Sequence, residues 1–187
     1  MKAEYLREKE MEHVFAGLTP ENALVMRVCI HTGLRVSDVL CFKPPVKAQF
    51  WITEQKTGKK RRVNLVAGLV DELNKVSGRH WVFEGRSDST KHRTRQAVWK
   101  DIKKAAKFFK IPVNVSPHTA RKIYAVNRLD KEKGDITKVQ KALNHDRPEV
   151  TILYAIADKL YESKYEEIDG RIVKKGGKRG RKRKQED

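Results

Sequence analysis

A predicted helix begins with the sequence Ser116-Pro117-His118-Thr119-Ala120-Arg121. Serine is a preferred N-cap residue and proline is favoured at the first helical position, so we expect this helix to run to about Leu129. His118 and Arg121 are three residues apart and therefore share one helix face, close to backbone amides that attract anions. The pair predicts a phosphate-binding surface, although H-x-x-R alone is a common pattern.

Two further reactive side chains follow, His145 and then Tyr154 nine residues later. Asn144 can end the preceding helix in the left-handed conformation and thereby fix His145. A tyrosine phenol has an unperturbed pKa of about 10 and becomes a useful nucleophile where positive groups hold an electrophile beside it. We therefore predict that Tyr154 attacks a phosphodiester. A core role is the alternative for Tyr154, and Tyr161 and Tyr165 are competing phenols.

A second arginine, Arg35, stands just after a predicted helix that begins at Thr19-Pro20 and ends at Gly33. Proline at the first helical position and glycine just past the last one are frequent helix boundaries. Two arginines match the oxygens of one phosphate. Asp38 could orient Arg35 through a salt bridge, and an ordinary surface ion pair is the alternative.

Alternating residues at 50–54 and 62–65, around a turn that contains Gly58, predict a β-hairpin. Lys56, in its basic tip, could donate a proton to a leaving oxygen, a role for which Lys59 competes. Lys56 could also be one solvated member of a charge run. The predicted DNA contacts of the tip are Lys59, Lys60, Arg61 and Arg62.

Most of the remaining chain has helical periodicity. Val98, Ile102 and Phe109 belong to an apolar stripe of helical spacing. We predict an α+β fold that is mainly α-helical, with one small β-hairpin or sheet. The further predicted elements are helices over residues 37–40, 66–76, 136–143 and 146–165 and a loop or short strand over 81–83.

The composition indicates one domain with a polyanionic partner. The chain has 187 residues, and 42 Lys and Arg against 24 Asp and Glu give a net charge of +18. Residues after Gly170 carry +7 of this charge, so residues 1–170 carry +11. A basic folded body usually binds nucleic acid, and a merely solubilising surface is the alternative. We predict one domain over residues 1–170 and a basic, disordered tail over residues 171–187.

The cysteines and the first residues indicate the compartment. Cys29 and Cys41 have apolar neighbours, which favours buried reduced thiols over a disulfide between them. The first residues are charged throughout, and no apolar run approaches the length of a membrane span. We expect a soluble, cytoplasmic, DNA-associated protein.

In order and spacing, these pieces resemble the catalytic domain of the tyrosine recombinase (phage integrase) family. The resemblance covers about residues 10–165 and follows the family's order at five sites, which makes it specific. The matching pieces are Thr32-Gly33-Leu34-Arg35-Val36-Ser37-Asp38, Lys56-Thr57-Gly58-Lys59, His118-Thr119-Ala120-Arg121, and Leu143-Asn144-His145 with Tyr154.

The resemblance implies a site-specific recombinase or integrase and a role for each residue. Tyr154 would attack and form a 3′-phosphotyrosyl link, and Lys56 would protonate the 5′-hydroxyl leaving group. His118 would assist proton transfer, and Asp38 would support Arg35. The implied catalytic residues are Arg35, Lys56, His118, Arg121, His145 and Tyr154.

The resemblance also implies the partners. Double-stranded DNA would be the substrate, with four protomers on two sites, accessory DNA-bending proteins, and neither a metal nor another cofactor. The segment after Tyr154 would pack on a neighbouring protomer, and a virus or plasmid would be the source. The family's N-terminal DNA-clamping domain has no room here, so we expect a catalytic-domain fragment or a minimal member.

Departures from the family pattern leave two alternatives open. Asn144 stands where a glycine is usual, and Asp146 places an acid beside the expected phosphate site. One alternative is a type IB topoisomerase-like enzyme, which relaxes DNA by similar chemistry. The other is a DNA-binding module that has this fold and no catalytic activity.

Overall fold

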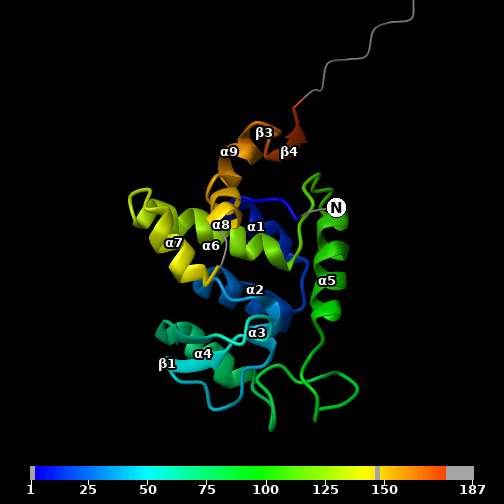
Figure 1. Ribbon diagram of the computed structural model, residues 1–187. Coiled ribbons are helices and arrows are strands. Elements are labelled where there is room, and N and C mark those ends of the chain that lie inside the picture. The colour runs from blue at the N-terminus through cyan, green and yellow to red at the C-terminus, as the bar shows by residue number, and fades with distance from the viewer. Residues whose placement is uncertain (1–2, 146–147, 176–187) are drawn as a thin grey trace, which may run out of the picture.

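The computed structural model describes residues 3–145 and 148–175, and it is mainly helical with two small antiparallel sheets. The predicted fold class is confirmed. Figure 1 shows α6 in the middle of the molecule, with α2 on one side and the segment from α8 to α9 on the other. The helices are α1 Glu8–Ala16, α2 Pro20–Thr32, α3 Val36–Leu40, α4 Ala67–Val76, α5 Arg95–Phe108, α6 Pro117–Lys131, α7 Ile136–Leu143, α8 Pro148–Ala155 and α9 Ala157–Glu162.

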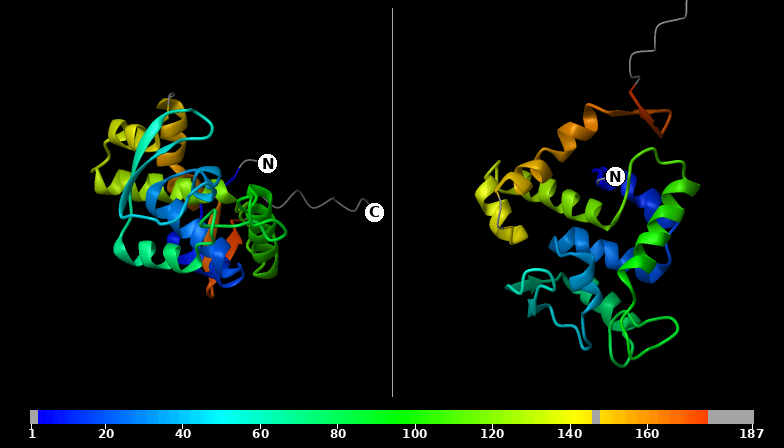
Figure 2. Two further views of the ribbon diagram at one scale, coloured as in Figure 1. Left: turned by 90° about the horizontal axis from the view of Figure 1, so that it is seen from below. Right: turned by 45° about the vertical axis from the view of Figure 1, so that its right-hand side comes forward.

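The strands form two hairpins at opposite ends of the molecule (Figure 2). In the first hairpin, Trp51 pairs with Arg62, and Phe50 and Val63 of the same strands face the interior. In the second, Ile168 pairs with Arg171. The strands are β1 Gln49–Thr53, β2 Lys60–Asn64, β3 Tyr165–Ile168 and β4 Arg171–Lys174.

The predicted caps around α2, α6 and α7 are found in the structure. Ser116 accepts a hydrogen bond from the His118 backbone at the start of α6. Gly33 and Asn144 are left-handed, with φ of 67° and 56°, at the ends of α2 and α7. These caps matter for function because each one precedes a predicted site residue along the chain.

The single helix expected over residues 146–165 is wrong. α8 and α9 are separate helices, since Ile156 leaves helical geometry between them, and Tyr165 opens strand β3. No glycine or proline marks this break, which is why the sequence pattern did not reveal it. Residues 146–147, which include the acid expected beside the phosphate site, Asp146, lie outside the described residues.

The first residues assigned to a disordered tail also differ from expectation. Residues 171–174 form β4, which pairs with β3 across Asp169 and Gly170, and both of these have positive φ. An Asp-Gly pair between two strands is a strong signal for a two-residue hairpin turn, so the sequence did contain this information. Residues 176–187 lie outside the described part of the chain.

Two smaller expectations about the remaining chain can be compared with the structure. Of the loop and the short strand expected over residues 81–83, the structure has the loop, with one isolated bridge just after it, from Glu84 to His92. Cys29 is buried as expected, Cys41 is half-buried, and both are free thiols. Of the helices that the structure describes, none is long and apolar enough to cross a bilayer.

Candidate active site

One small cavity brings the predicted catalytic residues together. Its volume is about 290 Å³, and its side chains come from the start of α3, the β1–β2 turn, α6, the end of α7 and α8. None of the described residues that line it is acidic, so it suits an anion. The lining residues are Arg35, Lys56, Thr57, His118, Arg121, Asn144, His145, Val150 and Tyr154.

Arg121 is the buried centre of this cavity, with 2% of its surface exposed. Its guanidinium donates to the Gly33 carbonyl and, over 3.2 Å, to the Leu143 carbonyl. Burial, together with the positive charge of Arg35, lowers the pKa of Arg121 to about 10, which still leaves it charged near neutral pH. Arg121 thus joins the end of α2 to the end of α7 while its charge has no carboxylate partner among these contacts.

His145 is held from two sides. Its Nε2 lies 3.0 Å from Arg121 Nη2, and its Nδ1 lies 3.1 Å from the hydroxyl of the buried Thr151. A guanidinium can only donate, so Nε2 accepts and the ring proton sits on Nδ1, toward Thr151. In this geometry Nε2 is taken up by Arg121, so a bound phosphate would receive a hydrogen bond from Nε2 only after the ring turns.

Tyr154 lies at the edge of the cavity, half-buried. Its ring meets the His145 ring edge-on at 5.5 Å, and Lys122 Nζ lies 5.7 Å from its centroid. The ring also packs against a small apolar cluster of α6 and α7, so the expected core role is present together with access to the cavity. The competing phenols lie elsewhere: Tyr161 and Tyr165 are buried and donate to Glu10 and Glu4.

His118 and Lys56 stand at the cavity mouth. The His118 ring is exposed to solvent, yet partial desolvation and then the charges of Arg121 and Arg35 lower its pKa below the ordinary value of 6.5. Lys56, rather than Lys59, lines the cavity, and its side chain is exposed. His118 is therefore neutral near pH 7.

The partner of Arg35 is Glu54 and not Asp38, which corrects the predicted salt bridge. Arg35 Nη1 donates to Glu54 Oε2 over 2.6 Å, and Glu54 is 1% exposed. Burial alone would raise the pKa of Glu54, but hydrogen bonds from Arg35 and Thr57 and the charge of Arg61 outweigh it, so the net pKa is lowered. Glu54 was missed because its partner lies 19 residues away and only the hairpin brings them together.

Asp38 supports the backbone around the site instead. One oxygen of its carboxylate accepts a hydrogen bond from the Gln55 amide over 2.8 Å. Burial is the main reason that the pKa of Asp38 is raised. The physical reason for the error is geometric: the Asp38 carboxylate is held by the peptide N–H of Gln55 in the β1–β2 turn, whereas the Arg35 guanidinium is held by Glu54.

Only some of the basic side chains of the β1–β2 hairpin are exposed to solvent. Lys60 and Arg62 are exposed together with Trp51, and Lys59 is exposed in the turn. Arg61 alternates to the other face, where its guanidinium donates to the Thr32 carbonyl and lies 3.6 Å from Glu54. A DNA contact by Arg61 is therefore not supported, and strand periodicity explains why.

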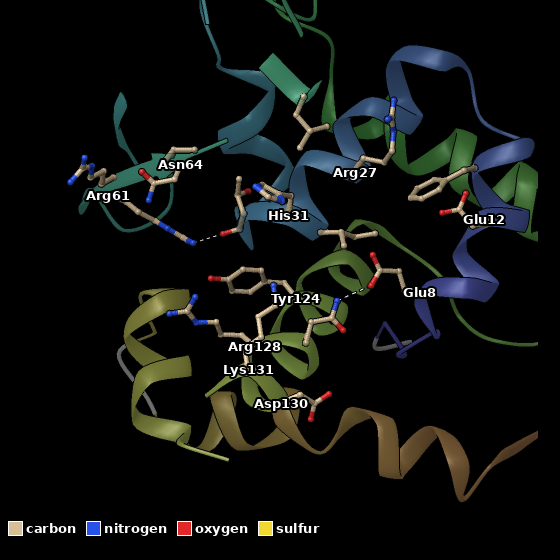
Figure 3. Close-up of a pocket in the computed structure, with 17 residues that line it drawn as sticks. Glu8, Glu12, Arg27, His31, Arg61, Asn64, Tyr124, Arg128, Asp130 and Lys131 are labelled. Atoms are coloured by element: carbon tan, nitrogen blue, oxygen red, sulfur yellow. Dashed lines mark hydrogen bonds between the residues drawn. The ribbon is translucent and has the colours of Figure 1, made fainter. Parts of the chain in front are cut away.

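A second cavity of about 890 Å³ lies behind the turn that follows α2 (Figure 3). In the close-up, Arg61 reaches across from β2 to α2, and Tyr124 of α6 lies beneath this contact. Tyr124 also packs tightly on Gly33, because a Cβ at that position would come within 2.4 Å of its ring. The rear wall thus fixes the turn from which Arg35 emerges.

This fold and this site define the class of tyrosine recombinase catalytic domains. The chain belongs to the phage integrase family, whose model matches residues 4–160.

Similar sequences support this assignment. A probable integrase/recombinase, YoeC of Bacillus subtilis (strain 168), is 28% identical over 131 residues, which cover 67% of this chain and 71% of YoeC. A tyrosine recombinase of Thermosipho africanus (strain TCF52B) is 27% identical over 167 residues, covering 81% of this chain and 56% of that protein.

Solved structures share the fold. A lambda integrase dimer bound to a COC′ core site superposes with a TM-score of 0.68 at 17% identity, covering 83% of this chain and 48% of that one. The catalytic domain of bacteriophage HP1 integrase gives a TM-score of 0.61 at 22% identity, covering 83% and 89%. The chain thus spans about half of the lambda integrase chain and most of an isolated catalytic domain.

Proposed function

We propose that this chain is the catalytic domain of a site-specific recombinase that cuts and rejoins duplex DNA through a 3′-phosphotyrosyl intermediate. The observation that carries the proposal is the convergence of two arginines, two histidines, a lysine and a tyrosine on one cavity without an acidic lining residue among those described. Membership of the phage integrase family and names such as integrase/recombinase among its relatives support the same activity.

In the proposed cleavage step, the Tyr154 oxygen forms a bond to phosphorus while the bond from phosphorus to the 5′ oxygen breaks. Arg35 and Arg121 bind the non-bridging oxygens and stabilise the charge that develops on them. The neutral His118 accepts the phenol proton, and Lys56 gives a proton to the departing 5′ oxygen. One phosphodiester is exchanged for another, so the step consumes no external energy.

The buried charge of Arg121 explains why a phosphate would bind here. Burial and the neighbouring Arg35 disfavour the charged guanidinium, as its lowered pKa reflects. An anion in the cavity would compensate both arginines at once, and an ionised Tyr154 oxygen is attracted by Arg121 in the same way. We therefore assign the two arginines to phosphate binding and His145 to completing the hydrogen-bond shell.

The proposed partner is double-stranded DNA, with recombination carried out by a homo-tetramer on two sites. The solved structures that share the fold include a lambda integrase dimer bound to a COC′ core site and a lambda integrase tetramer bound to a Holliday junction. The exposed Lys59, Lys60 and Arg62 of the hairpin would contact the DNA backbone. Accessory DNA-bending proteins, association with cellular DNA, and a viral or plasmid origin belong to the same proposal.

The experiment is covalent trapping on nicked DNA. A library of randomised duplexes is used, each with a nick near a possible cleavage site, so that the target sequence does not need to be known. A protein–DNA adduct that survives denaturation supports the proposal. Relaxation of supercoiled DNA without site preference would favour the topoisomerase-like alternative. Tight DNA binding with no adduct would favour a non-catalytic module.

A further inference from the structure

A second groove adjoins the catalytic cavity and shares His118 and Tyr154 with it. Its volume is about 1150 Å³, which exceeds the usual range of small-molecule sites, about 300–1,000 Å³. The groove runs between α5 and the start of α6, with Val36 of α3 at one side. Its size and its continuity with the cavity suit a polymer that passes through the catalytic centre.

The chemistry of the groove is aromatic and basic. Trp99 is 44% exposed, outside the buried stripe of α5 that contains Val98 and Ile102. Lys103 Nζ lies 5.8 Å from the Trp99 ring centroid and donates to Asn114. Among the described residues that line the groove, the charged ones are all basic. This combination of an aromatic face and positive charge is how proteins hold a single nucleic-acid strand.

We propose that this groove holds unpaired nucleotides of the cleaved DNA strand next to the scissile phosphate, with Trp99 stacked on a base. The inference rests on the proposed function, because it takes the phosphate to be bound by Arg35 and Arg121. The cavity of about 290 Å³ is too small to hold the neighbouring nucleotides as well, so these must lie outside it. The groove is the space that continues from Tyr154.

Base pairing decides which form of DNA the groove takes. A base inside a duplex has both faces covered by its neighbours, so it can stack on Trp99 only after it leaves the stack. The groove should therefore discriminate between unpaired and fully paired DNA. A site that contacted only phosphates would bind both forms alike.

The test uses the full chain and a duplex with a three-nucleotide single-stranded 3′ tail, in which one thymine is replaced by 5-iodouracil. Ultraviolet irradiation should crosslink the tail to Trp99, as located by peptide mass. The Trp99→Ala variant should bind the tailed duplex about tenfold more weakly, while its affinity for the blunt duplex changes by less than about twofold. Trp51→Ala, which removes another exposed tryptophan, is the matched control and should not distinguish the two DNAs.

Crosslinks confined to other residues, or an equal loss of affinity for both duplexes in Trp99→Ala, would overturn the proposal. The crosslink is measured on the native chain, so it does not depend on the folding of a variant. A native chain that forms the covalent adduct without a Trp99 crosslink refutes the groove and leaves the proposed function standing. A Trp99 crosslink without any adduct supports the groove as a site for unpaired nucleotides and refutes the proposed cleavage.

Discussion

At the scale of single residues, the site depends on positive charges that are held by few counter-ions. Arg121 is almost completely buried and is bound by two carbonyls and a histidine nitrogen. Arg35 is held by Glu54, which also lies beside Arg61. Glu54 is therefore the one carboxylate, among the described contacts, that fixes the position of an arginine proposed to bind the scissile phosphate.

Replacing Glu54 by glutamine should weaken both folding and cleavage. Loss of one partner of a buried ion pair typically costs about 3–5 kcal/mol, and displacement of Arg35 should slow cleavage by about 10²-fold. Urea unfolding and adduct formation measure the two effects. Glu72→Gln is the control, because its pair with Arg27 is exposed and worth at most about 1 kcal/mol. Equal effects of the two variants would contradict the role of Glu54.

His118 should make the protein sensitive to acid. Its pKa is lowered in the folded state, so the unfolded chain binds more protons and the free energy of unfolding falls as pH drops below about 6.5. His31, whose pKa burial and then Lys131 also lower, contributes in the same direction. The loss of stability from about pH 8 to about pH 5.5 should therefore be smaller in His118→Gln than in the native chain. An unchanged pH dependence would exclude this account of His118.

At the scale of elements, helix caps place the proposed catalytic groups. The turn at Gly33 ends α2 and aims Arg35, the Ser116 cap begins the helix that carries His118 and Arg121, and Asn144 ends α7 just before His145. Of these caps, Gly33 is the most constrained, because it combines positive φ with close contact to Tyr124.

Two glycines with the same backbone angle separate these constraints. Gly33 and Gly58 both have φ of 67°, but a Cβ at Gly58 meets nothing within 4 Å. Gly58→Ala should cost about 1 kcal/mol through backbone strain alone. Gly33→Ala adds the clash with Tyr124 and should cost about 2–4 kcal/mol in the free energy of unfolding. Similar losses in the free energy of unfolding for the two variants would show that the Tyr124 ring moves aside at little energetic cost.

The same caps explain how much of the molecule could be predicted from sequence. Ser116, Gly33 and Asn144 act through neighbouring residues, so their effect can be read locally. Glu54 acts on Arg35 through the pairing of distant segments, and the inward turn of Arg61 depends on strand register. The break between α8 and α9 has no local signal. The Asp169-Gly170 turn did have one, and it was hidden by the basic composition around it.

At the scale of the whole molecule, the segment after α8 packs on the start of its own chain. Tyr161 donates to Glu10 over 2.7 Å, and Lys164 and Tyr165 both contact Glu4. Sequence reasoning placed this segment on a neighbouring protomer. The single chain contains an intramolecular alternative, in which β3 and β4 extend the domain beyond residue 170.

The net charge of +18 should make DNA binding strongly dependent on salt concentration. Residues 176–187 should account for a measurable part of this salt dependence. Residues 176–187 carry six Lys or Arg and two acids. Their deletion should weaken non-specific DNA binding and reduce the slope of log affinity against log salt by up to about five. Fluorescence anisotropy at several salt concentrations measures this slope. A Gly/Ser segment of equal length is the control, and an unchanged slope after deletion would show that the segment does not contact DNA.

Identifying the residue that carries DNA after cleavage tests the central claim most directly. The adduct on nicked DNA is digested with nuclease, and the modified peptide is sequenced by mass spectrometry. We predict a nucleotide on Tyr154, no adduct in Tyr154→Phe despite retained DNA binding, and an adduct in Tyr161→Phe. A nucleotide on any other residue, or an adduct that persists in Tyr154→Phe, would contradict the account.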